Sequence, residues 1–391
     1  MFQVRTYNKI SNKGLSRFND NYQVGEDVGA PEGILLRSQK LHDEQLPESV
    51  MAVARAGAGT NNIPVDEYSK KGIVVFNTPG ANANAVKELV LAGMLLSSRG
   101  IMPGKAFVDG LGEMTDSGEM SKLLEKEKKN YAGSELMGKT LGVIGLGAIG
   151  SMVADAALAL GMKVLGHDPA LSVEAAWRLS SQVERKESVE ALLSEVDYLS
   201  LHVPAIPATK HMINAERLAV MRPDAAIMNF ARDAVIDQQA VVQALDAGKL
   251  RQYVCDFPEP CLIAHEKVIA LPHIGASTAE AEENCAIMAV NQLRDYLENG
   301  NILNSVNFPA TSMPRGENHC RITFTNENVS GVLGHVLSIF AENDVNVVDM
   351  VNKSRNNVAY NILDLMEKPS DDVIQAIRNV EHVISLRALC R

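Results

Sequence analysis

The segment 141–150, which reads LGVIGLGAIG, constrains the fold of this chain more than any other stretch. Its first four residues are mostly apolar and predict a short buried strand. Gly145, Gly147 and Gly150 then follow with the spacing G-x-G-x-x-G. In such a turn the first glycine permits a tight bend, the second lets backbone approach a pyrophosphate, and the third lets helix and strand pack closely. The segment therefore predicts the phosphate-binding turn of a dinucleotide site.

The residues after this turn complete a strand–helix–strand unit. Apolar side chains recur with helical spacing as far as Gly161, and segment 163–167 predicts a second strand that ends at Asp168. The helix N-terminus offers free N–H groups to phosphates. Asp168 can accept hydrogen bonds from both ribose hydroxyls, and its charge would repel a 2′-phosphate, which favours NAD over NADP. A glycine turn before a helix can be purely structural, but the complete unit favours a cofactor site.

Composition limits the classes of protein that remain. A chain of 391 residues is long enough for two or three domains with ample core. The formal net charge of −11 argues against nucleic acid as a partner, because neutralising phosphates takes clustered Lys and Arg. An anionic small substrate would need a local basic pocket.

The cysteines and the apolar segments predict a cytoplasmic protein. The five cysteines are scattered and form no C-x-x-C pair, which is typical of reduced thiols without a zinc site. The first residues lack the apolar run of a signal peptide. The longest apolar stretch, near residues 89–96, is too short to cross a bilayer. We therefore expect neither a membrane nor a metal as partner.

The segment before the glycine turn has its own α/β alternation. Strands are predicted at 33–37 and 51–55, and they end in Arg37 and Arg55. Ligands bind beyond the carboxyl ends of parallel strands, where two guanidinium groups can clamp an anion. The alternative for each arginine is a solvated charge at a strand end. The glycine-rich loop that follows Arg55, with Gly57, favours the clamp.

The predicted architecture is a doubly wound parallel sheet of the Rossmann type with a discontinuous second domain. Strands after Asp168 are expected at 197–203, 225–229, 253–256 and 268–271, and a long helix at 279–298 leads back to the first domain. We predict a substrate domain of residues 1–97 plus 276–312 and a cofactor domain of residues 98–275. Residues 308–318 contain two prolines and a glycine and predict a linker. Residues 313–391 are assigned to a third domain and predict a βαββαβ open sandwich.

Three residues at successive strand ends have the chemistry of hydride transfer. Oxidising a secondary alcohol needs a base for the hydroxyl proton, and His273 is the natural candidate. Glu259 can hold the imidazole by a hydrogen bond, and Arg232 can bind a carboxylate beside the reacting carbon. Each alone is more often structural, but all three follow strands on the cofactor's side of the sheet.

These motifs together resemble the D-2-hydroxyacid dehydrogenase family over nearly the whole chain. The resemblance rests on RAGAGT from Arg55, NTP from Asn77, the glycine turn, HDP from His167, NFAR from Asn229, DFPEP from Asp256 and PHIGAST from Pro272. It implies a flavodoxin-like substrate domain and an Arg/Glu/His triad of Arg232, Glu259 and His273. The DFPEP segment is two residues shorter than is usual in the family, so Glu259 is the residue that alignment selects.

The resemblance also implies a cofactor set and a reaction. Asp256 would bind the nicotinamide carboxamide, and His202 would shape the adenosine-side loop. The predicted cofactor-binding set is Gly145, Gly147, Ala148, Ile149, Gly150, Asp168, His202, Val203, Pro204, Thr209, Phe230, Ala231, Asp256 and Gly275. The expected reaction is NAD-dependent oxidation of 3-phosphoglycerate, the first step of serine synthesis. Arg37, Arg55 and Gly57 would then bind the phosphorylated end of the substrate, and Arg232 its carboxylate.

The C-terminal unit resembles an ACT domain, a regulatory module that binds amino acids. Asn328 and Asn346 match ligand positions of that module, so serine is an expected regulatory ligand. The resemblance implies a homodimer or homotetramer. The alternatives are another D-2-hydroxyacid dehydrogenase acting on glyoxylate or hydroxypyruvate, lactate or 2-hydroxyglutarate, a non-catalytic NADH-sensing protein, and an ACT unit that serves only for dimerisation.

Overall fold

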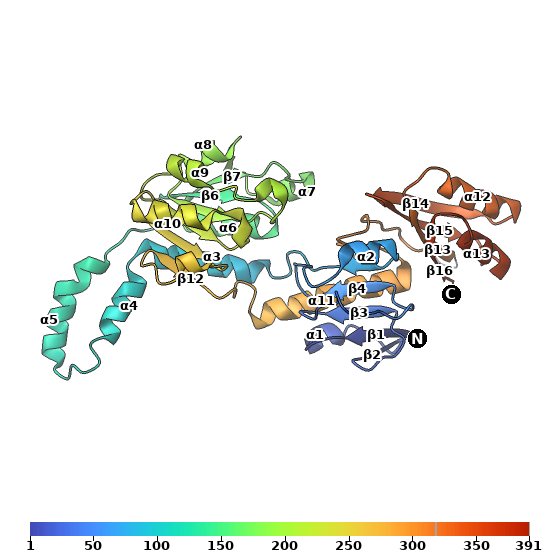
Figure 1. Cartoon of the computed structure of the whole chain (residues 1–391), viewed down its shortest axis with the longest axis horizontal. Coiled ribbons are helices and arrows are strands. Elements are labelled where there is room, and N and C mark those ends of the chain that lie inside the picture. Colours follow the sequence, from blue (N-terminus) through green and yellow to red (C-terminus); the bar gives the residue numbers. More distant parts are fainter. Residues whose placement is uncertain (317–318, 391) are drawn as a thin grey trace. The chain divides into compact units, whose positions relative to one another are not determined.

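The computed structural model describes residues 1–316 and 319–390, without the side chain of Glu174, and the chain divides into two compact units. Unit 2 is Ala83–Thr278, and unit 1 combines Met1–Asn82 with the described residues from Ala279 onward. Figure 1 labels many of their elements. The first unit is therefore discontinuous, as predicted, because α11 (Ala279–Asn299) returns the chain to it.

Unit 2 is built on a seven-stranded sheet. Its strands are β6 (Thr140–Ile144), β7 (Lys163–His167), β8 (Val183–Arg185), β9 (Tyr198–Leu201), β10 (Ala226–Asn229), β11 (Gln252–Cys255) and β12 (Val268–Ala270). They lie in the order β12-β11-β10-β9-β6-β7-β8, and every neighbouring pair is parallel. This is the doubly wound order, and the direction of winding changes between β6 and β9. The predicted Rossmann-type sheet is confirmed.

Helices cover both faces of this sheet. They are α3 (Ala83–Ser98), α6 (Ala148–Ala159), α7 (Val173–Arg178), α8 (Val189–Leu193), α9 (Ala215–Val220) and α10 (Gln238–Asp246), with the 3₁₀ turns η2 (Pro207–Thr209), η3 (Asp233–Val235) and η4 (Pro260–Leu262). The two-residue period of a strand sends Ile227 into one hydrophobic cluster with Leu245, and Met228 into the other with Val90 and Val153. Burial on both faces explains why these strands are almost wholly apolar.

Helix α3 belongs to unit 2, although we predicted a boundary after residue 97. Its residues Val86, Val90 and Met94 are buried in the same cluster as the sheet residue Met228. A Cβ on Gly93 would lie 3.1 Å from a methyl carbon of Val254, so the helix lies very close to the sheet. This packing moves the boundary to residue 82.

A helical hairpin extends from the sheet of unit 2 (Figure 1). It consists of α4 (Ile101–Asp109) and α5 (Ser117–Glu127), which the 3₁₀ turn η1 (Lys128–Tyr131) follows. Neither helix has a buried residue. The charged run at 125–129 is therefore solvated, as its composition indicates.

Unit 1 contains a five-stranded parallel sheet. Its strands are β1 (Phe2–Thr6), β2 (Tyr22–Gly25), β3 (Gly33–Leu36), β4 (Ala52–Arg55) and β5 (Val74–Phe76), and its helices are α1 (Asn12–Leu15), α2 (Val65–Lys70) and α11. The order β2-β1-β3-β4-β5 is flavodoxin-like, as predicted. Leu293 of α11 packs with Leu35 and Ala54 of the sheet in one buried cluster.

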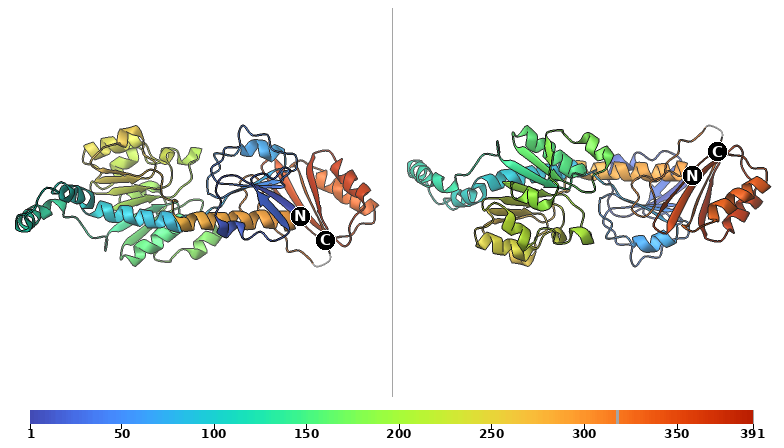
Figure 2. Two further views of the ribbon diagram at one scale, coloured as in Figure 1. Left: turned by 90° about the horizontal axis from the view of Figure 1, so that it is seen from below. Right: turned by 90° about the horizontal axis from the view of Figure 1, so that it is seen from above.

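A four-stranded antiparallel sheet follows in the same unit. Its elements are β13 (Cys320–Glu327), α12 (Val332–Glu342), β14 (Val347–Arg355), β15 (Val358–Leu365), α13 (Asp371–Arg378) and β16 (Val383–Leu389). The strand order is β14-β15-β13-β16, and both helices lie on one face of the sheet (Figure 2). The predicted βαββαβ order is present.

This C-terminal sheet shares a hydrophobic cluster with the rest of unit 1. Tyr360 and Ile362 of β15 are buried with Tyr296 of α11 and with Phe308. Phe308 lies in the segment between α11 and β13, which we call the connecting segment. We predicted a linker and a separate domain from residue 313. The structure instead groups the C-terminal sheet with unit 1, because the connecting segment supplies buried apolar side chains to the shared core.

The expectation that all five cysteines are reduced is wrong for two of them. Cys320 and Cys390 form a disulfide, whereas Cys255, Cys261 and Cys285 are free thiols. The pairing of β13 with β16 places Arg321 opposite Leu389, so the next pair of residues is Cys320 and Cys390, with Cα atoms 4.3 Å apart. The spacing of the cysteines did not predict this pair, because the two residues are 70 positions apart in the sequence.

Two further observations concern residues 1–316 and 319–390. None of their helices has both the length and the apolar character that a membrane span needs. Nor do three or more of their His, Cys, Asp or Glu side chains gather in a way that would hold a metal ion.

Candidate active site

The glycine turn between β6 and α6 has the geometry that its sequence predicts. Gly145 has φ +89°, and a Cβ there would lie 2.7 Å from the backbone of His202. A Cβ on Gly150 would lie 1.9 Å from the carbonyl oxygen of Gly145, so only glycine permits this approach of helix and strand. Around Gly147 a Cβ would meet no atom within 4 Å, which leaves open space beside the backbone.

Helix α6 presents an uncapped N-terminus to this open space. Gly147 is its N-cap residue, and no side chain bonds to the first N–H groups. Ala148 and Ile149 begin the helix. Uncapped N–H groups and the positive end of the helix dipole together suit an anionic phosphate. The turn therefore fits the pyrophosphate of a dinucleotide.

Asp168 closes the turn from the neighbouring strand β7. One carboxylate oxygen accepts a hydrogen bond from the backbone N–H of Leu146 at 2.8 Å, and the other accepts from the N–H of Ala170 at 2.9 Å. The carboxylate is half-buried and sits directly beside the glycine turn. Asp168 thus orders the turn in addition to offering the remaining lone pairs of its carboxylate to a ribose.

The loop after β9 faces the same turn. The imidazole Nε2 of His202 bonds with the hydroxyl of Ser200 at 2.8 Å, whereas its buried Nδ1 has no partner among the described residues. Burial lowers the pKa of His202 to about 3, so the ring is neutral at physiological pH. A methyl group of Val203 would contact a Cβ on Gly145. Thr209 closes this loop by donating to the carbonyl of Pro204.

The turn after β10 is shaped by Asn229, which we did not predict as a site residue. Its side chain is fully buried, accepts a hydrogen bond from the N–H of Ala231 at 3.1 Å, and donates to the carbonyl of Arg232 at 3.0 Å. Phe230 and Ala231 are buried, and Arg232 is exposed. The position of Asn229 at the start of the NFAR motif was its only signal in the sequence.

Asp256 ties the end of β11 to the loop that carries His273. Its buried carboxylate accepts a hydrogen bond from the N–H of Ile274 at 2.8 Å and another from the N–H of Gly275 at 2.7 Å. A Cβ on Gly275 would lie 2.9 Å from this carboxylate, so the glycine permits the contact. Both bonds are charge-assisted and hold the residue next to His273 in place.

Phe257 brings Arg232 and His273 together. The rings of Phe257 and His273 have centroids 4.4 Å apart, and the guanidinium of Arg232 lies 5.4 Å from the Phe257 ring centre. His273 is exposed and has φ +55°, a left-handed conformation that the two bonds to Asp256 support in the adjacent residues. Phe257 was not among the predicted site residues, and only its place in the DFPEP motif pointed to it.

Glu259 lies on the same strand-end segment but makes other contacts. Its backbone N–H donates to the side chain of Gln238 at 2.9 Å, and Gln238 in turn donates to the carbonyl of Phe257 at 3.0 Å. The Glu259 side chain is exposed and has no hydrogen bond to His273 among the described residues. The predicted carboxylate–imidazole bond therefore stays a prediction.

The predicted substrate arginines lie in unit 1, where the structure brings them together. Arg55 donates from Nε to the carbonyl of Arg37 at 2.9 Å. The loop glycines make room for its guanidinium, because a Cβ on Gly57 would lie 3.6 Å from it. Arg37 forms an ion pair of 2.8 Å with Glu282 of α11, a residue that we did not predict. The two cations are thus adjacent, and one already has a carboxylate partner.

The two predicted regulatory asparagines lie at opposite ends of the C-terminal sheet. Asn346 precedes β14 at the end where β13 begins, since Val347 and Cys320 both pair with Leu365. Asn328 follows β13 at its other end and donates to the carbonyl of Asn356 at 3.0 Å. The eight residues of β13 span roughly 25 Å. One copy of the chain therefore does not bring both asparagines to one small ligand.

Known proteins share this chain's sequence and fold. Residues 103–275 match the model of the D-isomer specific 2-hydroxyacid dehydrogenase NAD-binding domain. The chain is 32% identical to a D-3-phosphoglycerate dehydrogenase of Haemophilus influenzae over 95% of this chain and 89% of that protein. It is 33% identical to one of Escherichia coli over 95% and 90%.

A solved structure with the same fold comes from Lactobacillus delbrueckii ssp. bulgaricus. It is a D-isomer specific 2-hydroxyacid dehydrogenase in its NAD-complexed form, with a TM-score of 0.64 at 22% identity over 78% of this chain and 99% of that chain. The open glycine turn, the uncapped helix N-terminus and Asp168 fit NAD as the cofactor. On sequence, fold and site, the chain belongs to the D-isomer specific 2-hydroxyacid dehydrogenases, which are NAD-dependent oxidoreductases.

Proposed function

We propose that this protein oxidises 3-phosphoglycerate to 3-phosphohydroxypyruvate with NAD and so opens serine synthesis. The observation that carries the proposal is the cluster of Arg232, Phe257 and His273 at consecutive strand ends of a sheet whose glycine turn fits NAD. The relatives named D-3-phosphoglycerate dehydrogenase support this substrate, because the similarity spans 89% and 90% of their lengths.

The proposed roles follow from the chemistry of each group. Bound NAD supplies the hydride acceptor. His273 takes the hydroxyl proton on its imidazole, and Arg232 pairs with the substrate carboxylate and polarises the reacting C–O bond. Glu259 orients the imidazole when substrate is bound, since catalytic hydrogen bonds are often loose before the complex forms.

The predicted cofactor contacts remain the proposed ones. Phosphates lie on the glycine turn with Ala148 and Ile149, the ribose on Asp168, and the adenosine side against the loop of His202, Val203, Pro204 and Thr209. Phe230, Ala231, Asp256 and Gly275 lie on the nicotinamide side. Asp256 already accepts two backbone hydrogen bonds, so the carboxamide takes one of its remaining lone pairs.

The phosphate of the substrate is assigned to unit 1. Arg37 and Arg55, with the backbone at Gly57, form the basic patch that an acidic chain needs for an anionic substrate. Because Glu282 pairs with Arg37 in the present structure, the phosphate would displace the Glu282 carboxylate or share the Arg37 guanidinium with it.

Regulation by serine is proposed to need two copies of the chain. Asn328 and Asn346 lie at opposite ends of the C-terminal sheet, whereas a small amino acid needs both within a few ångströms. Strand β14 is an edge strand, and most of its residues are exposed. Pairing of two such edges, within a homodimer or homotetramer in the cytoplasm, would bring Asn328 of one copy to Asn346 of the other.

A coupled assay tests the activity. NADH formation is followed by absorbance with 3-phosphoglycerate, and the ketone product is trapped to draw the reaction forward. We expect turnover with 3-phosphoglycerate that exceeds turnover with lactate or 2-hydroxyglutarate. Faster turnover with an unphosphorylated acid would reassign the substrate. Tight NADH binding without turnover of any hydroxy acid would identify a sensor.

Two substitutions test the proposed catalytic residues. Arg232→Ala and His273→Ala should each lower kcat by about 10²- to 10⁴-fold, because each removes a group that acts in the transition state. NADH affinity, measured by fluorescence titration, should change little. Arg185→Ala is the matched control, since Arg185 is an exposed arginine of the same unit that pairs with Glu187. Equal losses in the control would contradict the assignment.

A further inference from the structure

The C-terminal end of α11 is capped by side chains of the C-terminal sheet and of the segment before it. An α-helix leaves its last carbonyl groups without partners, and cations near that end are stabilising. Arg387 donates to the carbonyls of Tyr296 and Leu297, Arg315 to that of Glu298, Arg321 to that of Asn299, and Tyr360 to that of Gly300. Five consecutive carbonyls thus accept hydrogen bonds from three guanidinium groups and one phenol, and we call these four side chains the α11 cap.

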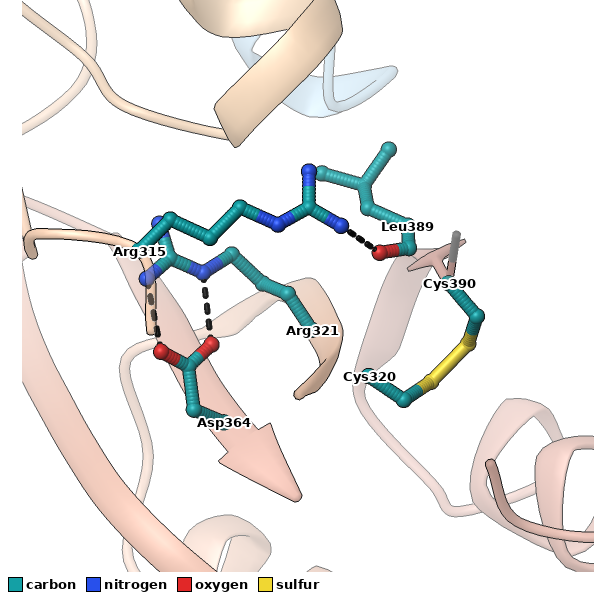
Figure 3. Close-up of a disulfide and its surroundings, with 6 residues drawn as sticks. All are labelled: Arg315, Cys320, Arg321, Asp364, Leu389 and Cys390. Carbon is teal, nitrogen blue, oxygen red and sulfur yellow. Dashed lines mark hydrogen bonds and ion pairs between the residues drawn. A yellow bond between two sulfur atoms is a disulfide. The ribbon is translucent and has the colours of Figure 1, made fainter. Parts of the chain in front are cut away.

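The disulfide joins the two strands that carry most of this cap. Cys320 directly precedes Arg321 on β13, and Cys390 directly follows Leu389 on β16 (Figure 3). The carbonyl of Leu389 accepts a hydrogen bond from Arg315. Arg321 is fully buried and is held by Asp364 through two bonds of 2.7 and 2.8 Å. The β13 side of the cap is therefore anchored without the disulfide.

The β16 side has no comparable buried ion pair among the residues that the structure describes. Strand β16 is an edge strand that pairs only with β13 in the described sheet. Its residues are mostly half-buried, in contrast to the fully buried β15. Arg387 contributes two bonds to the cap and stacks on the Tyr296 ring at 4.6 Å. An edge strand frays readily at its end, and the Cys320–Cys390 bond closes this end of β16, three residues after Arg387.

One cysteine of the pair is half-buried and borders a cavity. Cys390 lines a cavity of about 350 Å³ between α13 and β16, together with Lys368, Arg378 and Asp371. Cys320 is 4% exposed. Thiol–disulfide exchange requires a thiolate to reach one sulfur. In the lining of this cavity the cations Lys368 and Arg378 outnumber the single acid Asp371, which favours an anionic thiol.

We propose that Cys320 and Cys390 form a thiol–disulfide exchange site for small anionic thiols, and that this site controls the α11 cap. In the reducing direction an incoming thiolate attacks the sulfur of Cys390, a mixed disulfide forms there, and Cys320 leaves as a thiolate that takes up a proton. A second small thiolate then attacks the small-molecule sulfur of the mixed disulfide, Cys390 leaves as a thiolate that takes up a proton, and the small molecule departs as its symmetric disulfide. Two electrons pass from two small thiols to the protein disulfide. In the reverse direction the symmetric small-molecule disulfide oxidises the two cysteines.

Opening the bond loosens β16 and with it the bonds of Arg387 to α11. The disulfide also closes a loop of 70 residues, so its loss frees the chain on both sides. Helix α11 begins at Ala279, six positions after His273 in the sequence. The redox state of the pair is thereby linked to the order of the helix that leads away from the catalytic loop.

Thiol counting and hydrogen exchange on the full chain test this proposal without any activity assay. After incubation with oxidised glutathione, titration in denaturant should find the three thiols of Cys255, Cys261 and Cys285, and after dithiothreitol all five. Amide exchange of the last turn of α11 and of β16 should be about tenfold faster in the reduced protein. Five thiols under both conditions, or equal exchange rates, would overturn the proposal.

Two sets of variants locate the effect. Cys390→Ser should exchange like the reduced protein with or without dithiothreitol, whereas Cys261→Ser, the matched free-cysteine control, should keep the difference. The double variant Lys368→Ala, Arg378→Ala should slow reduction by glutathione by about tenfold and slow reduction by 2-mercaptoethanol much less, because the 2-mercaptoethanol thiolate lacks the carboxylates of glutathione. Equal slowing with both reagents would remove the anionic-thiol assignment, and a redox-sensitive Cys390→Ser would remove the pair itself.

Discussion

Individual residues of the site gain their roles from contacts that sequence motifs do not show. Gly145, Gly147 and Gly150 behave as their spacing predicts, because backbone geometry alone dictates those roles. Phe257 is different, since it contacts Arg232 and His273 only because the ends of the three neighbouring strands β10, β11 and β12 are adjacent. The ring contacts both groups and supplies apolar surface between them.

Phe257 is expected to act as a positioning residue. Phe257→Ala should lower kcat by about tenfold, because it removes the ring surface that holds the side chains of Arg232 and His273 in position relative to each other. Phe257→Tyr keeps the ring and should restore most of the rate. The measurement is steady-state kinetics, with NADH affinity as the check on folding. A loss in the tyrosine variant as large as in the alanine variant would contradict a role for the ring.

The buried His202 makes unit 2 sensitive to acid. The pKa of His202 is about 3 in the folded chain against an ordinary value of 6.5. Between these two pH values the unfolded chain therefore binds a proton that the folded chain does not bind. The free energy of unfolding is therefore expected to fall as pH drops below about 6.5, and to level off near pH 3. His202→Gln should flatten this decline, by a few kcal/mol at most. Denaturant titrations between pH 7 and 4 measure it, and an unchanged slope in the variant would contradict the prediction.

At the scale of elements, hydrogen bonds between neighbouring strand ends fix the site. Asp168 after β7 bonds to the glycine turn after β6, and Asp256 after β11 bonds to the loop after β12. Parallel strands deliver their carboxyl ends to one edge, so these acids can reach across to adjacent loops. Each predicted ligand residue therefore also holds its neighbour in place.

The two hydrogen bonds that Asp256 accepts from the loop of His273, which we call the Asp256 clamp, should be weakened by a substitution that hardly changes the size of the side chain. Asp256→Asn replaces one acceptor with an amide donor, so one of the N–H groups of Ile274 and Gly275 loses its partner at a cost of about 1–3 kcal/mol. We expect faster amide exchange in the loop of His273 and a lower kcat. Asp246→Asn is the control, because Asp246 is an exposed acid on α10 that contacts His265. Unchanged loop exchange would refute the clamp.

At the scale of the whole molecule, the C-terminal sheet is part of unit 1 and not a tethered tail. Arg321 and Asp364 form a buried ion pair, and the guanidinium also donates to the carbonyls of Met313 and Pro314. The connecting segment is therefore held against the sheet. Regulation through this sheet would act on a continuous structure that includes α11.

Serine inhibition should show complementation between copies. Asn328→Ala and Asn346→Ala should each abolish inhibition by serine, because each removes one half of every proposed site. Oligomers assembled from both variants contain one complete site per pair and should recover part of the inhibition. Asn379→Ala, an exposed asparagine at the end of α13, is the control. Mixed oligomers that remain insensitive would argue against a site shared between copies.

Much of the fold could be predicted because local patterns carry it. Apolar runs between glycine turns and polar strand ends predict parallel strands, and the glycine spacing with Asp168 predicts the cofactor edge. The boundary after residue 82 was not predictable, since Val90 and Met94 suit a helix packed on either unit. Amphipathicity reports that a helix is buried on one side and not which sheet covers it.

Local pattern in the amino-acid sequence was sufficient for the strands themselves, the glycine turn and the strand-end positions of Arg232 and His273. Tertiary packing alone placed Phe257 between those two residues, paired Arg37 with Glu282, joined Cys320 to Cys390 and separated Asn328 from Asn346. The physical reason is the separation along the chain over which each effect acts. Turn geometry and side-chain periodicity act between neighbours in the chain, whereas contacts across strand ends depend on which strands pair and in which register.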